Sequence, residues 1–485
     1  MKPYLKYKHS GIEWIGKIPE HWILKRLKHV AADKKFAIVD GPFGTQLKAE
    51  EYVDTGVPLI RISDLDYQGN LSTENIKYIT ESKADELIRS GIYRNDLIIA
   101  KTGATIGKSG INDKINFGII ASSCLKISCD LKTTLPNYLR FLISSHGFQT
   151  EMINSSGGST RDTINITPFS NLFINLPPYS EQQAIANYLD DKTSKIDTLI
   201  EKKQRLIALL KEQRTAIINQ AVTKSINPKA KMKDTGIEWL GEIPEQWEIN
   251  IVKRYFQINL GKMLDGKSQQ LRGGELKSYL RAANIHWNRI LLDDVYKMKF
   301  TTEELKRYRL KEGDLLVTEG GVTVGRSAIW KGEMAECYYQ NSINRVRPKN
   351  NRNIKWLYYW LYFLKVNGFI DLIADKSTFG HLTQEKLEVV PMPIMPQDEE
   401  NALVNYLDKK TTEIDNVIER TSSTILPLQE YRTALISEVV TGKVDVRGYV
   451  RYKEQPEGLL MAAEKKAGYK AKSIADSGLK PEPGF

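Results

Sequence analysis

Apolar residues recur at a near seven-residue spacing in two long stretches of this chain, with polar residues between them. The first stretch carries Leu189, Ile196, Leu210 and Ile217 on one track and Leu199 and Leu206 on another, and the second carries Leu407, Ile414, Val417, Leu428 and Leu435. A stripe of about 40 residues runs for about 60 Å of helix, more than one small core needs. The pattern predicts two spacer helices that pair as an antiparallel coiled coil. Two separate amphipathic helices, each on its own domain, are the alternative.

Prolines mark the start of each long helix, because proline is favoured in the first turn. The prolines at 177 and 178 precede the first stretch, and those at 391, 393 and 396 precede the second. Capping and acidic residues follow at 180–183 and 398–401, where the helix dipole favours negative charge. Pro427 should kink the second helix unless a helix begins there.

Short apolar runs and glycine turns fill the remaining regions. The runs at 96–100 and 314–317 have the length and composition of buried strands, and 135–144 and 354–366 have helical character. This mixture predicts two globular domains of the α/β (α+β) class.

Much of the chain occurs twice. Residues 11–22 return at 236–247 with nine of twelve positions identical, and 187–190 return at 405–408. We call 11–22 and 236–247 the leading segments. Two copies predict a pseudo-twofold molecule, in which differences between the copies allow two different things to be recognised. The predicted organisation is a first leading segment and domain (1–178), a spacer helix (179–226), a second leading segment and domain (227–396), a second spacer helix (397–446) and a weakly ordered tail (447–485).

The net charge of +11 favours an anionic partner such as nucleic acid, although general surface charge is an alternative. Only Cys124, Cys129 and Cys337 occur, without paired spacing, which argues against a disulfide framework or a zinc site. The first residues lack the apolar core of a signal peptide, and no run of eighteen apolar residues occurs. We therefore expect a cytoplasmic chain without a membrane span.

Three motifs resemble catalytic ones without meeting their requirements. The glycine turn at 103–109 has three residues between its glycines where a phosphate loop needs four, and its repeat at 320–327 has arginine in place of lysine. Residues 175–179 resemble the Asn-Pro-Pro-Tyr motif of amino-group DNA methyltransferases, but a leucine interrupts them and no cofactor loop precedes them. None of the six histidines recurs between copies. We therefore predict no catalytic residue and no metal site.

Both copies retain the glycine turn with a threonine and a cation, which could present N–H groups and positive charge to a phosphate. A tight hairpin with one solvated base is the alternative. Polar and cationic residues near these turns are the predicted DNA contacts: Arg61, Lys101, Thr102, Thr105, Lys108, Ser159, Thr160, Arg161, Arg281, Asn284, Thr323, Arg326, Ser377, Thr378 and His381. Arg61 and Arg281 could instead be ion-paired within their domains, because both copies retain them.

The leading segments, Asp40-Gly41-Pro42-Phe43-Gly44, the paired glycine turns, the Asn-Tyr-Leu-Asp helices and residues 440–445 together resemble the specificity subunit of type I restriction-modification systems. The resemblance covers residues 7 to about 446 and omits the tail. It implies a non-catalytic subunit with two target recognition domains, each reading half of an asymmetric bipartite site in double-stranded DNA. The helices would set the gap between the halves.

The resemblance also implies partners. Two methyltransferase subunits would dock on the helices, and motor-nuclease subunits would join that complex. S-adenosylmethionine, ATP and magnesium would be bound by those partners, and no cofactor by this chain. The predicted spacer and docking residues are Tyr188, Leu189, Ile196, Leu210, Tyr406, Leu407, Ile414 and Leu428.

Two other classes of function remain open. A standalone methyltransferase or nuclease would need a cofactor loop or clustered carboxylates, which the sequence lacks. A coiled-coil protein adaptor would bind DNA only through its general basic charge, so no defined sequence would compete better than bulk DNA.

Overall fold

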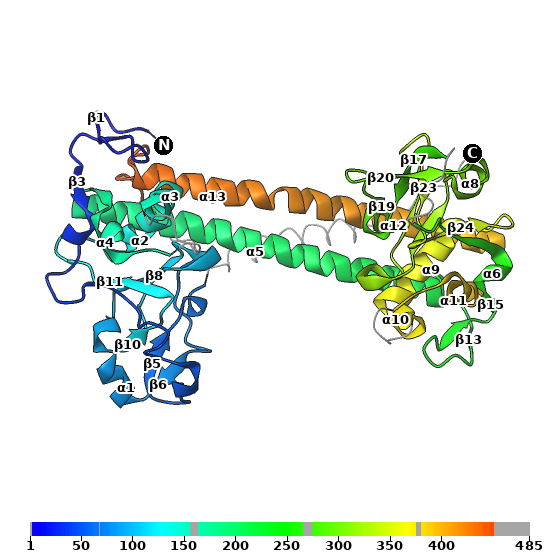
Figure 1. Cartoon of the computed structure of the whole chain (residues 1–485), viewed down its shortest axis with the longest axis horizontal. Coiled ribbons are helices and arrows are strands. Elements are labelled where there is room, and N and C mark those ends of the chain that lie inside the picture. The colour runs from blue at the N-terminus through cyan, green and yellow to red at the C-terminus, as the bar shows by residue number, and fades with distance from the viewer. Residues whose placement is uncertain (1, 67, 156–162, 265–273, 375–379, 451–485) are drawn as a thin grey trace, which may run out of the picture. The chain divides into compact units, whose positions relative to one another are not determined.

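The computed structural model describes residues 2–66, 68–155, 163–264, 274–374 and 380–450 (Figure 1). The chain forms two compact units, of which unit 1 comprises residues 1–202 and 424–485 and unit 2 comprises 203–423. The long helix α5 (Tyr179–Lys224) contributes to both. Most of the tail predicted to be weakly ordered lies outside the described residues.

Unit 1 contains one copy of the repeat. Its strands are β1 (Tyr7–His9), β2 (Lys17–Pro19), β3 (Ile23–Arg26), β4 (Ile38–Asp40), β5 (Val57–Ile60), β6 (Lys77–Ile79), β7 (Gly91–Tyr93), β8 (Leu97–Ala100), β9 (Ser109–Ile111), β10 (Phe117–Ile120), β11 (Cys124–Ile127) and β12 (Phe173–Leu176). Its helices are α1 (Glu81–Glu86), α2 (Pro136–Ser144), α3 (His146–Ser155), α4 (Ile166–Asn171), α13 (Ile425–Val440) and the start of α5, with 3-10 turns η1 (Leu27–His29), η2 (Ala49–Glu51), η3 (Ile62–Asp64), η4 (Ile88–Ser90) and η5 (Gly103–Thr105).

Unit 2 contains the other copy. Its strands are β13 (Met232–Asp234), β14 (Glu242–Pro244), β15 (Glu248–Ile251), β16 (Phe256–Leu260), β17 (Glu275–Leu280), β18 (Ile285–His286), β19 (Arg289–Ile290), β20 (Tyr296–Phe300), β21 (Leu315–Thr318), β22 (Ser327–Ile329), β23 (Tyr338–Tyr339), β24 (Ile343–Pro348) and β25 (Pro391–Ile394). Its helices are α6 (Val252–Tyr255), α8 (Thr302–Tyr308), α9 (Ile354–Val366), α10 (Phe369–Ile373), α11 (Gln384–Glu388), α12 (Gln397–Ser423) and the end of α5, with 3-10 turns η6 (Ala282–Asn284) and η7 (Gly321–Thr323).

The two copies share their sheet topology. The order β4-β11-β8-β9 in unit 1 corresponds to β16-β24-β21-β22 in unit 2, and the pair β12-β3 corresponds to β25-β15. Each copy also has one parallel pairing, β5 with β10 and β17 with β23, in an otherwise antiparallel sheet. The predicted α/β class and the two-copy architecture are thus confirmed.

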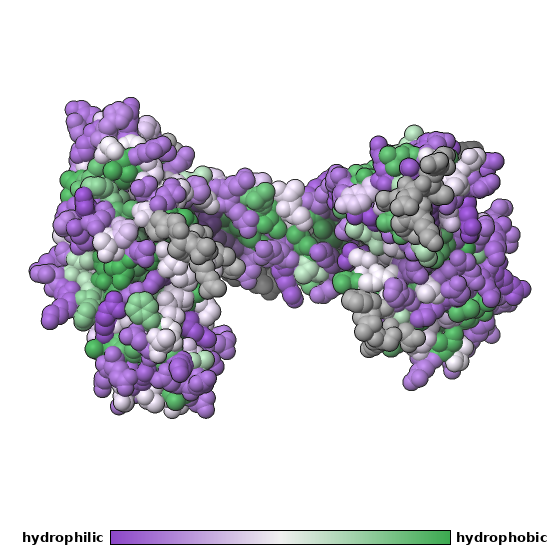
Figure 2. Space-filling model, viewed as in Figure 1, coloured by the Kyte–Doolittle hydropathy of each residue, from purple (hydrophilic) through white to green (hydrophobic). Residues whose placement is uncertain are grey.

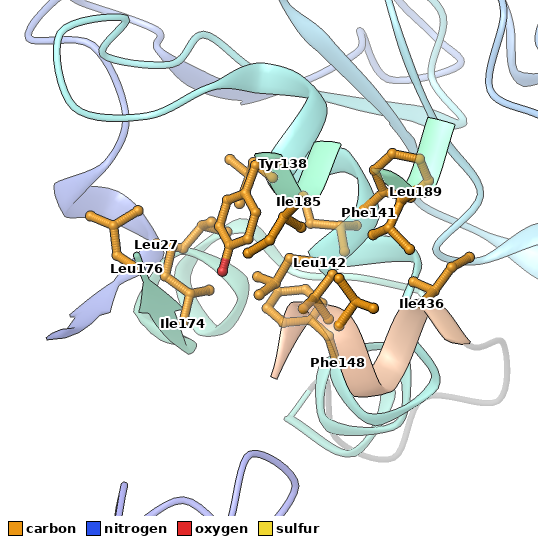
Figure 3. Close-up of a cluster of buried hydrophobic side chains, with 14 of the residues drawn as sticks. Leu27, Tyr138, Phe141, Leu142, Phe148, Ile174, Leu176, Ile185, Leu189 and Ile436 are labelled. Atoms are coloured by element: carbon orange, nitrogen blue, oxygen red, sulfur yellow. The ribbon is translucent and has the colours of Figure 1, made fainter. Parts of the chain in front are cut away.

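The buried strands and helices follow from the apolar runs. Strands β8 and β21 are buried throughout, as expected of continuous runs that pack on both faces of a sheet. In unit 1 the side chains of α2, α5 and α13 pack with η1 and β12 around Tyr138, Leu142, Ile185 and Ile436 (Figure 3). This core joins the sheet-bearing domain to the long helices within one unit.

The long helices pair antiparallel in each unit. In unit 1 the Arg432 guanidinium of α13 lies 2.8 Å from the Asp197 carboxylate of α5. In unit 2 the Arg214 guanidinium of α5 lies 2.9 Å from the Asp415 carboxylate of α12. A new helix, α13, begins at Ile425, so Pro427 lies in a first turn, where it costs no helical hydrogen bond.

The predicted second apolar track is wrong as a buried seam. Leu199 and Leu206 are 43% and 44% exposed, and Val417 is 43% exposed. The residues of α5 that are buried lie toward its two ends, such as Ile185 in unit 1 and Ile218 in unit 2. The predicted antiparallel pairing of the long helices is confirmed in each unit, and only the burial expected of these three side chains is wrong.

Each leading segment is tied to the start of a long helix. The Trp22 indole donates to the Glu181 carboxylate on α5 at 2.9 Å, and the Trp247 indole donates to Glu399 on α12 at 3.0 Å. Both tryptophans are buried completely. The repeated tryptophan and glutamate therefore have one structural role, which the sequence analysis missed although both residues recur.

Candidate nucleic-acid interface

The two glycine turns have the same backbone. Each follows a buried strand, β8 or β21, and contains a 3-10 turn, η5 or η7. Gly103 and Gly107 have φ of 73° and 81°, and Gly321 and Gly325 have φ of 71° and 77°. Only glycine adopts this left-handed region without strain. The glycines therefore set the shape of a turn that both copies present.

Each turn pairs with a segment far along the chain. In unit 1 the Ile164 N–H donates to the Lys101 carbonyl at 2.9 Å, and Thr102 bridges to Thr163. In unit 2 Gly320 bridges to His381. The predicted contacts Ser159, Thr160, Arg161, Ser377 and Thr378 lie outside the described residues, and the residues that pair with the turns lie two or three positions farther along the chain.

The cations of the first copy are engaged within the domain. The Lys101 ammonium lies 2.6 Å from the Asp40 carboxylate, and Arg89 reaches the same carboxylate at 3.0 Å. Burial alone would raise the pKa of Asp40, but the hydrogen bond and charge of Lys101, with the charge of Arg89, lower it. The Lys108 ammonium donates to the Leu65 carbonyl. Thr105 is exposed on the turn.

The turn of the second copy presents different side chains. Arg326 is half-buried and its guanidinium forms no ion pair with the described residues. The Thr323 hydroxyl donates to the Gly320 carbonyl at 3.3 Å. His381 is exposed and packs so closely that a Cβ on Gly320 would lie 2.6 Å from its Nδ1. Val322 is 92% exposed.

The arginines predicted farther from the turns are held inside their domains. The Arg61 guanidinium binds the Asp64 carboxylate at 2.7 Å. Arg281 binds Asp294 at 2.6 Å and lies 3.5 Å from the ring centre of Tyr296.

The buried Asn284 amide donates to the carbonyls of Leu291 (3.0 Å) and Asp294 (3.1 Å). These ion pairs agree with the alternative interpretation of Arg61 and Arg281, in which each arginine is ion-paired within its own domain. A DNA contact by these three residues stays a prediction.

The predicted spacer and docking residues lie mostly in the chain's own packing. Tyr188, Leu189, Ile196, Leu407 and Ile414 are buried, whereas Leu210, Tyr406 and Leu428 are partly exposed. Buried side chains hold the long helices in place and leave any partner to meet neighbouring faces. Hydrophilic residues cover most of the face of each unit seen in Figure 2.

Asn175, in the segment that resembles a methyltransferase motif, has a structural role. Asn175 is buried and donates to the Tyr138 hydroxyl at 3.2 Å and to the Val440 carbonyl. Within the described ranges, no group of three or more His, Cys, Asp or Glu side chains could hold a metal ion. No helix among those residues is long and apolar enough to cross a membrane.

Two copies of one mixed fold, each with a glycine turn of the same backbone and a long helix, define a repeated recognition module. The family model described as the type I restriction modification DNA specificity domain matches residues 42–209 and 244–421. The chain therefore belongs to this family and is a DNA-recognition subunit of a type I restriction-modification system.

Known type I specificity proteins are similar to this chain over nearly its whole length. The EcoKI specificity subunit of Escherichia coli is 19% identical, covering 96% of this chain and 98% of that protein. The crystal structure of the HsdS subunit from Thermoanaerobacter tengcongensis is 16% identical with a TM-score of 0.53, covering 90% of this chain and all of that one. A structure from work on complex assembly of the type I R-M system is also 16% identical, with a TM-score of 0.64, covering 88% and 99%. These structures share the fold of this chain.

Proposed function

We propose that this chain is the non-catalytic subunit that reads an asymmetric bipartite DNA site, with one half read by each repeat copy. The observation that carries the proposal is the pair of glycine turns with the same backbone and different neighbouring side chains. A shared backbone suits the phosphates, which are the same in every sequence, and different side chains suit two different half-sites.

Charge and turn geometry support the phosphate contact. A net charge of +11 favours association with DNA and makes the affinity dependent on salt. The turn in unit 2 adds Arg326, a cation without an internal partner among the described residues. Turns of this kind present successive N–H groups that can bind an anion. The proposed contact therefore needs no rearrangement of the turn.

We further propose that two methyltransferase subunits and the motor-nuclease subunits assemble on this chain in the cytoplasm. The relatives are named as specificity subunits of type I restriction enzymes, which supports such partners. The exposed faces of α5, α12 and α13, beside the buried Tyr188 and Leu407, are the proposed docking surfaces. S-adenosylmethionine, ATP and magnesium would be bound by those partners.

Methylome sequencing tests the proposal directly. A methylation-deficient host would carry this chain with its cognate modification subunit, and a second strain would carry residues 248–391 from a related chain in place of its own. We expect a bipartite methylated motif, of which only one half changes on the swap. Co-purification of the subunits without any methylated motif would favour the adaptor alternative and contradict DNA reading.

A further inference from the structure

One position of the repeated scaffold carries opposite charges in the two copies. In unit 1 this position is Lys101, which directly follows β8. Its N–H donates to the Ser123 carbonyl at 2.8 Å, and its carbonyl accepts from Ile164 at 2.9 Å. The Lys101 ammonium is paired with Asp40 at 2.6 Å, and both side chains are largely buried. The first copy therefore holds this cation in a closed ion pair.

Glu319 stands at the equivalent position of unit 2, directly after β21. It forms the same two backbone hydrogen bonds, donating to the Ser342 carbonyl at 2.9 Å and accepting from Leu382 at 2.6 Å. Leu260 of unit 2 is equivalent to Asp40 of unit 1. Each is the last residue of a strand and is followed by a glycine that packs against the backbone of a facing segment. The second copy thus keeps the backbone and replaces both members of the ion pair.

Among the residues that the structure describes, the Glu319 carboxylate forms no hydrogen bond and no ion pair. Burial raises the pKa of Glu319, the charge of His381 opposes that shift and Glu385 adds to it. The half-buried Glu319 carboxylate is hydrated on its open side, and a hydrogen-bond donor of a bound molecule can take the place of that water.

The location of Glu319 restricts what that donor can be. The residue precedes Gly320, which begins the glycine turn and bridges to His381. Phosphates are negatively charged and repel a carboxylate, so a DNA backbone at this turn would not be its partner. Exocyclic amino groups of bases are hydrogen-bond donors, and acidic side chains accept from them. A carboxylate here is suited to a base edge.

We propose that Glu319 is a specificity-determining residue that accepts a hydrogen bond from the exocyclic amino group of one base in the half-site read by unit 2. The inference rests on the proposed function and adds the residue and the chemical group. Cytosine N4, adenine N6 and guanine N2 share this chemistry. Lys101 is paired with Asp40 and has no acceptor atom, so the equivalent position of unit 1 cannot accept such a hydrogen bond.

The test uses the intact modification complex with wild-type chain, Glu319→Leu or the control Glu385→Leu. Leucine keeps roughly the size of Glu319 and removes both acceptor oxygens, and Glu385 is an exposed carboxylate on the neighbouring helix α11. Methylome sequencing gives the motif of each complex, and duplexes changed at single positions compete for binding in vitro. We expect Glu319→Leu to lose about tenfold of the discrimination at one base position of one half-site. The base required there by the wild type identifies the amino group.

Each outcome decides the inference. An unchanged motif and unchanged competition for Glu319→Leu would overturn it, as would equal weakening on every duplex, which would indicate a structural role. The same change in Glu385→Leu would also overturn it, because general charge would then be the cause. A wild-type complex without any methylated motif would refute the proposed function itself, and this inference with it.

Discussion

Glu181 is the anchor of the first leading segment, and replacing it should release that segment. Its carboxylate accepts hydrogen bonds from the Trp22 indole at 2.9 Å, the Tyr4 hydroxyl at 3.1 Å and the His21 imidazole at 2.6 Å. Trp22 and Tyr4 are buried, whereas His21 is exposed. Burial and the charge of Glu181 raise the pKa of Tyr4 well above its usual range, so the hydroxyl remains a donor.

The expected cost of Glu181→Ala follows from the two buried donors. A hydrogen bond to a charged group contributes about 1.5–3 kcal/mol, so losing two gives about 3–6 kcal/mol. His21 is left out of this value because water can replace its partner. Glu181→Gln is the matched control, since its carbonyl oxygen can still accept from both buried donors. We expect that variant to cost about 1 kcal/mol.

Hydrogen exchange measured by mass spectrometry on peptides spanning residues 2–26 reports this loss locally. Because every 1.4 kcal/mol changes an equilibrium about tenfold, Glu181→Ala should lower the protection of these peptides by about 100-fold or more where they exchange by local opening. Peptides from unit 2 serve as the internal control. Unchanged protection around Trp22, or equal losses in both variants, would refute the reasoning.

Three shorter predictions concern the turn and its neighbours. Gly321→Ala should lower the free energy of unfolding by about 1–2 kcal/mol from left-handed backbone strain alone. Gly325→Ala should lower it more, because its Cβ would also lie 2.6 Å from a side chain, and thermal melts of the two variants compare the losses. Arg326→Ala should weaken binding to all duplexes alike and lower the slope of log K against log salt by about one, measured by salt titration. Asp40 has a lowered pKa in the fold, so its pairing with Lys101 adds stability above the usual pKa of 3.8 that is lost as the pH falls through the folded value. Asp40→Asn should therefore be less stable than the wild type at neutral pH. The difference in free energy of unfolding between the two, measured by denaturant melts, should become smaller as the pH is lowered.

The elements with strong periodicity were predictable from sequence. Helix α9 occupies residues 354–366 as expected, and the prolines located the start of α5, because both signals are local. The exposure of Leu199 and Leu206 was not predictable from spacing. A heptad pattern says which side chains share a helix face, whereas burial depends on which elements of the fold cover that face.

The parts of the candidate site that depend on local sequence signals were also predictable. The glycine turns are local features, so their pairing in the two copies could be read from sequence. The bond between Arg61 and Asp64 spans three residues and is also a local signal, but Arg281 reaches Asp294, thirteen residues away, across a strand pairing that the sequence does not reveal. Glu319 was not predictable, because a carboxylate was not expected among DNA contacts and its position beside the turn depends on the fold.

The two copies of the repeat distinguish positions that require glycine from positions whose side chain can change. Gly321 and Gly325 cannot be exchanged without backbone strain, because their φ angles lie in the left-handed region. The position of Lys101 and Glu319 has no such restriction, since neither residue has a positive φ and any residue except proline can form its two backbone hydrogen bonds. The charge of its side chain can differ between the copies while the fold is kept, provided that the facing residue, Asp40 in unit 1 and Leu260 in unit 2, changes with it. A duplicated scaffold of this kind can acquire a second specificity through a few side chains beside an unchanged turn.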